Sequence, residues 1–356
     1  MKKTIGILTL IVVILLLLVG SMGLLQGSTN QIKDADGNII PGSIAELTEL
    51  EIGGMSQWIL KRGYDQSNPV LLWLHGGPGA AQMPLAHYLD GELEREFVVV
   101  HWDQRGAGKS NHSGFDEATM SFDQFLSDTH ELIEYLKGRF NQDKIYLLGH
   151  SWGTMLGMEY ALRQPGNLYA FISVSQVVDN HRGGKIAYSW LTEQIRESSS
   201  ESDMSKLNEL GEPPYTKHSD HVDFAGLIGD YGGNFDVSMY RLARIAFRAP
   251  EYRLRDYYRW LNGANRGSGA MWDEIFARHI DYITEVPSVA IPVWFLVGDQ
   301  DKNTPRRLVE EYFEVIDAPL KRLVVFESSA HTPFLGEPEK FSEEVINVKY
   351  HLKDHE

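Results

Sequence analysis

Residues 149–153 have the sequence Gly-His-Ser-Trp-Gly, which places a serine between two glycines. The pattern follows an apolar run within residues 144–148, typical of a buried strand, and precedes a segment with the composition of a helix. A serine on such a sharp strand-to-helix turn needs glycine on both sides, because a side chain there would collide with the strand or the helix. The turn raises the hydroxyl above the sheet at a helix N-terminus, which favours developing negative charge. We therefore predict that Ser151 is a catalytic nucleophile.

Two residues late in the chain could activate this serine, since a hydroxyl is a poor nucleophile until a base takes its proton. His331 follows a predicted strand, and we expect it to accept the Ser151 proton and pass it to the leaving group. Asp301 follows the strand expected over residues 292–297, three residues beyond the glycine that ends it, and is predicted to be the acid of the site. Asp299 is the alternative acid.

Negative charge that develops on a reacting carbonyl oxygen needs hydrogen-bond donors. Residues 75–79, with the sequence His-Gly-Gly-Pro-Gly, follow the apolar run at residues 69–74, where the donor loop lies when a serine occupies such a turn. The glycines allow the backbone to approach a substrate closely. We predict the backbone N–H groups of Gly77 and Trp152 as the two donors of an oxyanion hole, since Pro78 has no N–H.

The composition excludes several other kinds of site and partner. The chain has no cysteine, which removes disulfides, thiolate metal ligands and a thiol nucleophile. His218 and His221 lie close together, but no third ligand stands out, so no metal site is expected. A net charge of −16 argues against a nucleic-acid partner, whose phosphates require a basic surface.

Strands and helices alternate in the segments that carry these residues, which predicts an α/β fold with a mostly parallel central sheet and helices on both faces. Residues 45–62 alternate in polarity around a Gly-Gly pair and predict a β-hairpin. Residues 121–140 have helical spacing, with Ser121 and Gln124 placed as a capping box. A closing helix is expected to begin at Pro338.

This core is predicted in two parts, residues 28–178 and residues 289–356. The intervening residues 179–288 contain no strand run comparable to the others and are rich in Tyr, Trp and Arg. A compact domain does not accommodate a structureless loop of that length, so we expect a helical cap. Residues 197–203, which are serines and acids, are expected to form a solvated link inside it.

Residues 1–27 are interpreted as a targeting segment. Lys2 and Lys3 precede an apolar run from Ile5 to Leu25, about 21 residues. At about 1.5 Å per residue, a helix of this length spans a hydrocarbon core of ~30 Å. We predict a retained signal anchor that keeps the protein at the cell membrane with its catalytic domain on the extracytoplasmic side. The alternative is a cleaved signal peptide and a secreted protein.

Together these motifs resemble the α/β-hydrolase superfamily, and within it the proline iminopeptidase-like branch of serine peptidase family S33. The resemblance rests on residues 75–79, 103–110, 149–153, 298–305 and 330–333. It implies the α/β-hydrolase fold and hydrolysis of a small peptide or acyl substrate by an acyl-enzyme route without a cofactor, often with release of an N-terminal residue. It also implies that residues 103–110 form a structural turn that supports the site, and they lack the spacing of a nucleotide-binding loop.

The resemblance is weaker in residues 179–288. Typical proline iminopeptidases carry a cap motif that holds the substrate's α-amine, and this motif has no clean match here. A buried substrate ammonium needs a carboxylate partner. Glu193 is the nearest candidate, and Asp179 and Glu212 are alternatives. Without an amine site, the same machinery would act as an esterase or lactonase on small acyl esters. A non-catalytic binding protein on this scaffold is disfavoured, because every expected catalytic position is filled.

Overall fold

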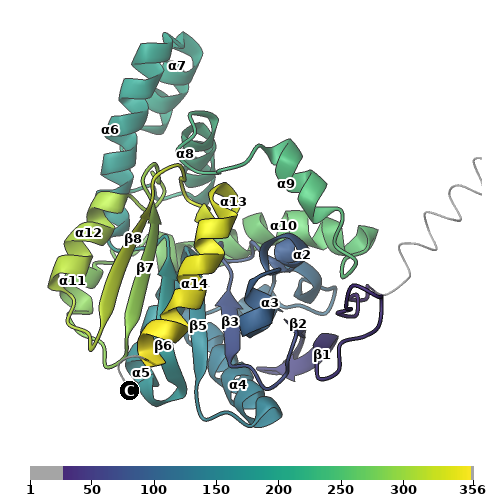
Figure 1. The fold of residues 1–356 in the computed structure, drawn as a ribbon. Coiled ribbons are helices and arrows are strands. Elements are labelled where there is room, and N and C mark those ends of the chain that lie inside the picture. Colours follow the sequence, from purple (N-terminus) through teal and green to yellow (C-terminus); the bar gives the residue numbers. More distant parts are fainter. Residues whose placement is uncertain (1–26, 354–356) are drawn as a thin grey trace, which may run out of the picture.

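An eight-stranded sheet organises the computed structural model, which describes residues 27–353 (Figure 1). In sheet order the strands are β1 (Ile44–Ile52), β2 (Met55–Gly63), β4 (Val98–Asp103), β3 (Val70–Leu74), β5 (Ile145–His150), β6 (Leu168–Val174), β7 (Val293–Gly298) and β8 (Lys321–Phe326). β1 and β2 form an antiparallel hairpin, and β2 is antiparallel to β4. The other neighbours pair in parallel. The predicted hairpin and the mostly parallel sheet are confirmed.

Helices cover both faces of this sheet, which explains why β3, β4, β5 and β7 are buried along their whole length (Figure 1). One face is covered by α4 (Phe122–Phe140), α5 (Trp152–Arg163) and α12 (Arg306–Val315), and the other by α2 (Ala86–Leu89), α3 (Leu93–Glu96), α13 (Pro333–Gly336) and α14 (Pro338–Lys353). Successive residues of a strand alternate between the two cores: Leu72 packs in the first and Trp73 in the second. The closing helix begins at Pro338, as predicted.

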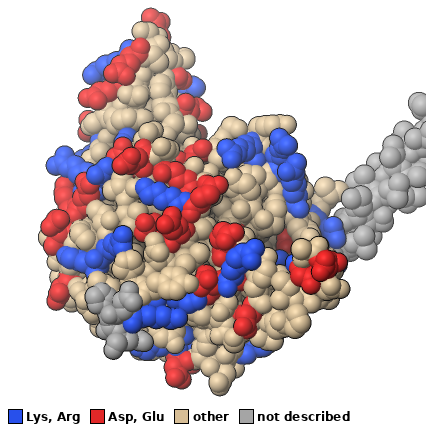
Figure 2. Space-filling view, viewed as in Figure 1, with Lys and Arg blue, Asp and Glu red and all other residues tan. Residues whose placement is uncertain are grey.

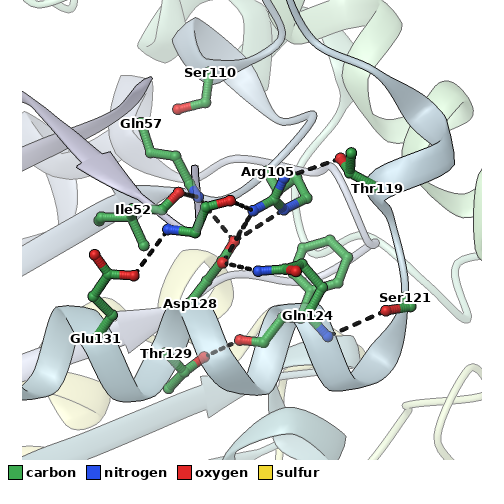
Figure 3. Close-up of polar contacts among 12 residues, drawn as sticks. Ile52, Gln57, Arg105, Ser110, Thr119, Ser121, Gln124, Asp128, Thr129 and Glu131 are labelled. Atoms are coloured by element: carbon green, nitrogen blue, oxygen red, sulfur yellow. Dashed lines mark hydrogen bonds and ion pairs between the residues drawn. The ribbon is translucent and has the colours of Figure 1, made fainter. Parts of the chain in front are cut away.

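The start of α4 differs from the predicted capping box. Ser121 Oγ accepts a hydrogen bond from the N–H of Gln124 at 3.2 Å, as expected. The Gln124 side chain does not return that bond, because its amide donates to Asp128 Oδ1 at 2.7 Å (Figure 3). Asp128 is buried and also accepts two bonds of 3.0 Å from Arg105, so its carboxylate collects the donors that a buried charge requires.

Arg105 belongs to the turn at residues 103–110, and its contacts account for that motif as a structural element. Its guanidinium also donates to Gly53 O at 2.9 Å, which ties the turn to the β1–β2 hairpin. On the other side, Lys109 forms an ion pair of 2.9 Å with Asp256. Two buried cations thus fix the turn between the hairpin and the segment that follows β6.

Between β6 and β7 the chain forms helices and turns over the carboxyl ends of the strands. They are α6 (Asn180–Ser198), α7 (Glu201–Leu210), α8 (His218–Asp230), α9 (Met239–Ala246), α10 (Leu254–Ala270), a short π-helix (Trp272–Phe276) and α11 (Tyr282–Glu285). α6 and α7 project from the body of the molecule in Figure 1. The expected solvated link is wrong for the most part, since only residues 199–200 separate α6 from α7.

The predicted anchor falls almost entirely on residues 1–26, which lie outside the described residues, as do residues 354–356. Within residues 27–353, no helix combines the length and the apolar character needed to cross a membrane.

Candidate active site

Ser151 lies between β5 and α5 with a backbone φ of 53° and ψ of −118°, a conformation that residues other than glycine rarely adopt. Its N–H donates to Val174 O at 3.0 Å, and the N–H and hydroxyl of Thr154 donate to its carbonyl at 2.8 and 2.6 Å. A Cβ at Gly149 would overlap the carbonyl oxygen of Gly153, and one at Gly153 would overlap the backbone of β3. Close backbone packing therefore holds the strained turn and requires both glycines.

His331 and Asp301 follow neighbouring strands and lie together. His331 Nδ1 is 2.9 Å from Asp301 Oδ2, and both side chains are buried. The carboxylate also accepts from the N–H and the hydroxyl of Thr304 at 2.8 and 2.7 Å. Burial opposes ionisation of Asp301, but the adjacent His331 and the Thr304 hydrogen bonds outweigh it and hold the pKa of the carboxyl below its usual value. An ionised Asp301 keeps the proton on Nδ1 of His331 and leaves Nε2 for proton transfer.

Asp299, the alternative acid, lies at the surface. Its carboxylate accepts from Arg306 Nη1 at 2.6 Å and is about half exposed. The turn after β7 is closed by the Asp301 N–H, which donates to Gly298 O at 3.3 Å. This turn directs one carboxylate inward and the other outward, so the structure brings Asp301 to His331 and leaves Asp299 away from it.

The loop that carries His331 is held by hydrogen bonds to its backbone. The His331 carbonyl accepts from the Ser175 hydroxyl at 3.0 Å and from His150 Nε2 at 2.9 Å. Burial, together with the nearby His331, lowers the pKa of His150 to about 3. His150 is therefore neutral at physiological pH, and its ring adds no positive charge beside His331. From the cap, Asn234 O accepts from the His331 N–H at 2.9 Å.

Asp236, two residues further along the cap, holds the same loop from both sides of His331. Its carboxylate accepts from the N–H of Ala330 and from the N–H and hydroxyl of Thr332, the last two at 2.7 and 2.8 Å. Sequence reasoning missed Asp236, because it belongs to no motif and lies more than ninety residues from its partners.

Gly77 and Trp152, the predicted oxyanion donors, both line the cavity beside Ser151. Gly77 has a φ of 113°, which favours glycine. A Cβ at the neighbouring Gly76 would lie 3.3 Å from Ser151 Cβ, so the loop passes directly against the serine. Neither predicted N–H has a protein acceptor within residues 27–353, which leaves both available to a developing oxyanion.

His75 and Gln104 hold this loop in place, although sequence reasoning assigned them no role. His75 Nδ1 donates to Gly76 O at 2.8 Å, and its Nε2 accepts from the Gln104 N–H at 3.2 Å. Gln104 Oε1 accepts in turn from the Trp152 indole N–H at 3.1 Å. Burial lowers the pKa of His75 to about 4, so the neutral ring can donate and accept at once. Their positions inside two of the motifs could have revealed them.

A cavity of about 640 Å³ lies over Ser151, between the strand ends and the cap. Apolar side chains from α8, α9, α10 and residues 213–215 form much of its wall. Among the described residues that line it, Asp179 is the only acidic side chain and Lys302 the only lysine or arginine. The cavity thus combines an apolar wall with one carboxylate.

Asp179 is the one amine-site candidate that reaches this cavity. As the N-cap of α6, its Oδ1 accepts from the Arg182 N–H at 2.9 Å and lies 3.3 Å from His279 Nε2. Its Oδ2 has no hydrogen-bond partner in the described part of the chain. Glu193 and Glu212 are exposed, and neither lines the cavity, so the structure does not bring the leading candidate Glu193 to the site.

His218 and His221, the closely spaced histidine pair, contact other side chains. His218 Nε2 is 2.9 Å from Ser268 Oγ, and the His221 ring packs 5.2 Å from the Trp272 ring. Burial lowers the pKa of His221 to about 4. No group of three or more potential metal ligands occurs in residues 27–353.

Comparison with known proteins supplies the family context. Residues 65–339 match the family model described as "Serine aminopeptidase, S33". The "Probable aminopeptidase YbaC" of Bacillus subtilis (strain 168) is 34% identical over 315 residues, which cover 87% of this chain and 98% of that protein. A "Proline iminopeptidase" of Heyndrickxia coagulans is 27% identical over 281 residues, 77% of this chain and 87% of that protein.

Solved structures show the same fold. A proline iminopeptidase-related protein from Thermus thermophilus superposes with a TM-score of 0.61 at 20% identity, over 87% of this chain and 98% of that chain. At this identity the likeness establishes the α/β-hydrolase fold and nothing about substrates.

Proposed function

Because the chain belongs to the S33 serine aminopeptidase family of α/β hydrolases, we propose that it releases N-terminal residues from peptides through a Ser-His-Asp triad and an acyl-enzyme. Ser151 is the proposed nucleophile, His331 the general base and Asp301 the residue that orients it. The 2.9 Å contact between His331 and Asp301, at strand ends on the same edge of the sheet as Ser151, supports these roles.

In the proposed reaction, His331 Nε2 takes the proton of the Ser151 hydroxyl as Oγ attacks the carbonyl carbon of the first peptide bond. The carbonyl oxygen becomes an oxyanion that accepts from the N–H groups of Gly77 and Trp152. His331 then protonates the leaving amine, the C–N bond breaks and an acyl-enzyme remains. Water, deprotonated by His331, hydrolyses the ester and regenerates Ser151.

The position of Asp179 on the cavity wall favours aminopeptidase activity. A free α-amine enters a largely apolar cavity as an ammonium, and it needs a carboxylate there to offset its loss of hydration. The Oδ2 atom of Asp179 has no partner among residues 27–353, and Asp179 is the only acid on the cavity wall. We propose that Asp179 binds the substrate ammonium, with proline or another small apolar residue against the surrounding apolar wall.

The second candidate function is hydrolysis of small acyl esters or lactones. The apolar extent of the cavity favours it, because an uncharged acyl chain would be buried there without any need for Asp179. The triad and the oxyanion donors would serve both reactions in the same way, so the two functions differ only in whether a free amine is required.

The deciding experiment compares kcat/KM for prolyl p-nitroanilide, its N-acetylated form and a short-chain p-nitrophenyl ester, using the full chain with Ser151→Ala as the blank. An aminopeptidase should prefer the free amine over the acetylated form by about 100-fold or more, as the loss of a buried charge pair implies. Equal rates on the two anilides, or activity on the ester alone, would contradict the aminopeptidase proposal and support the esterase.

Asp179→Asn separates amine binding from catalysis. Asparagine is also a good N-cap, so α6 should remain capped while the negative charge is lost. We expect kcat/KM for the free-amine anilide to fall about 10- to 100-fold, mainly through KM, with ester hydrolysis unchanged. A parallel loss on both substrates would indicate a structural role for Asp179.

We also propose that the enzyme is held at the cell membrane by residues 1–27, with its catalytic domain on the extracytoplasmic side. Lys2, Lys3 and the apolar run that follows them support this orientation. Protease treatment of intact cells should digest the catalytic domain, and recovery of the protein in the culture medium without these residues would favour secretion.

A further inference from the structure

The segment that contains α9 and α10 carries a charge opposite to that of the whole chain. Residues 238–266 contain seven arginines and no lysine, and their only acids are Glu251 and Asp256, in a chain of net charge −16. Both acids are buried, and Asp256 is paired with Lys109 at 2.9 Å. The exposed charge of this segment is therefore that of its arginines.

Several of these arginines have no partner of their own. Arg244, Arg248 and Arg255 are exposed and make no side-chain hydrogen bond or ion pair within the described residues. Figure 2 shows the basic side chains gathered over α9. Three unpaired guanidinium groups on one segment repel one another, so their arrangement is favourable for an external anion.

The same segment exposes large apolar side chains. Six of the 13 exposed large apolar residues of the described chain lie between positions 239 and 261, which concentrates them here. They are Met239, Tyr240, Phe247, Leu254, Tyr258 and Leu261. In α10, Leu254, Tyr258 and Leu261 are spaced by four and three residues and lie on one side of the helix. We call these six residues, with Arg241, Arg244, Arg248 and Arg255, the arginine face.

A hollow at one part of the arginine face is suited to phosphate. Arg241, Arg244 and Arg248 line a cavity of about 330 Å³ together with His87 and Tyr88. Arg241 Nη2 donates to the Tyr88 hydroxyl at 3.1 Å, which fixes one wall. Planar guanidinium groups bind phosphate oxygens in pairs, and aromatic side chains favour the boundary between water and hydrocarbon.

The first described residues contact the turn between α9 and α10. The Ser28 N–H donates to Pro250 O at 3.1 Å, and Gly27 lies so close to Glu251 that a Cβ would overlap its carbonyl oxygen. Residues 250–251 belong to the turn between α9 and α10. The apolar sequence from Ile5 to Leu25 therefore joins the folded domain beside the arginine face.

From these observations we propose that the arginine face docks on an anionic lipid bilayer, with its arginines on lipid phosphates and its aromatic and aliphatic side chains in the headgroup region. Binding to a second copy would bring arginines against arginines across a two-fold axis and is disfavoured by repulsion. Met239 and Leu261 also line the cavity over Ser151, so the docked membrane lies next to the substrate site. The docking does not depend on which substrate is hydrolysed.

The absence of cysteine allows a direct test on the full chain. A single thiol is introduced by Tyr258→Cys, or by Val315→Cys on α12 as the control, and is labelled with an environment-sensitive dye. The proteins are mixed with or reconstituted into vesicles of phosphatidylcholine alone or of phosphatidylcholine and phosphatidylglycerol in equal amounts. We expect the dye at position 258 to shift to the blue and to gain severalfold protection from aqueous iodide only in anionic vesicles, with no change at position 315.

Charge reversal tests the arginines themselves. Each arginine near an anionic surface is expected to contribute about fivefold to binding, so replacing Arg241, Arg244 and Arg248 by Glu should abolish the protection at position 258. The matched control replaces Arg139, Arg163 and Arg307 by Glu, an equal charge change on α4, α5 and α12, and should retain it. Equal protection in uncharged vesicles, none in anionic vesicles, or a shift without vesicles that grows with protein concentration would each overturn the proposal.

Discussion

The loops at the strand ends and the helices of the cap face the same cavity, but their residues are held to different degrees. Ser151, His331 and Asp301 are fixed by backbone contacts and by hydrogen bonds inside the core. The cap helices α6, α7 and α8 pack around a separate apolar cluster that includes Leu191 and Leu227, whereas α9 and α10 pack on one of the two cores of the sheet. The proposed chemistry thus lies where the fold is most constrained, and the proposed substrate recognition lies partly on helices that pack apart from the sheet.

Residues 234–236 of the cap contact the loop of His331 directly. Asn234 and Asp236 belong to the cap, yet they hold the backbone on both sides of His331. The cap is therefore more than a cover, because part of it helps to place the proposed base.

The largest effect is expected within the core. Ser151→Ala should lower kcat/KM by about 10⁴-fold or more on every substrate, because no other group can form the acyl-enzyme. His331→Ala should lower kcat/KM by a similar factor. The double variant should lower it little further, since the two residues act as a unit. Stopped-flow and steady-state rates check this, with circular dichroism to show that each variant is folded. Substantial residual turnover in either variant would remove that residue from the mechanism.

The next effect separates the two acids. Asp301→Asn should reduce kcat by about 10³- to 10⁴-fold, because His331 loses the partner that holds its tautomer. Asp299→Asn, only two positions away, removes a surface contact with Arg306 and should change kcat by less than about twofold. Initial rates on one substrate suffice, and a larger loss in Asp299→Asn would show that the acid has been misassigned.

Asp236→Ala tests the link between cap and core. The N–H groups of Ala330 and Thr332 would lose their shared acceptor, and the His331 loop would move. We expect kcat to fall about 10-fold with little change in KM, since substrate contacts remain. Asp236→Asn, which keeps one carbonyl acceptor, should recover part of the rate. A change confined to KM would place Asp236 in substrate binding instead of loop positioning.

A separate effect, on folding and not on turnover, concerns stability against acid. Burial lowers the pKa of His75 and His150 in the core and His221 in the cap to about 4, 3 and 4. Unfolded histidine titrates near pH ~6.5, so the unfolded state takes up these protons first as the pH falls. Stability is therefore full above pH ~6.5 and declines toward pH ~4, by about 1.4 kcal/mol per pH unit for each histidine.

Urea unfolding between about pH 7 and pH 5 measures this slope. His221→Gln should reduce the slope of the unfolding free energy against pH by the contribution of one histidine, while the core histidines stay in place. An unchanged slope would mean that the cap opens before the core unfolds and that His221 does not report on global unfolding.

Much of the core follows from local patterns in the sequence. Continuous apolar runs predict strands buried on both faces, and the glycines around Ser151 predict a turn that only small residues fit. The spacing from Gly298 favoured Asp301 over Asp299, and the turn after β7 directs Asp301 inward to His331. His75 and Gln104 stand inside two of the motifs, which marks them as candidates, but their contacts join three loops that meet only in the folded sheet.

The cap was harder to predict, because the choice among its acids depends on helix orientation. In α6, Leu191 and Ile195 are buried, which directs Glu193 to solvent. That spacing was visible in the sequence and could have excluded Glu193. Asp179 was visible only as one of three candidates, since the approach of α6 to the strand ends is a tertiary feature.

The order of the strands along the chain has a consequence for the protein's synthesis. The turn that holds Ser151 can form once β5 and α5 have been synthesised. Asp301 and His331 follow β7 and β8, which come after the whole cap segment. A chain grows from its N-terminus at about 5–20 residues per second. Until the last strands pair with the sheet, Ser151 lacks its proposed base, so we expect nascent or prematurely terminated chains to lack the proposed peptidase activity.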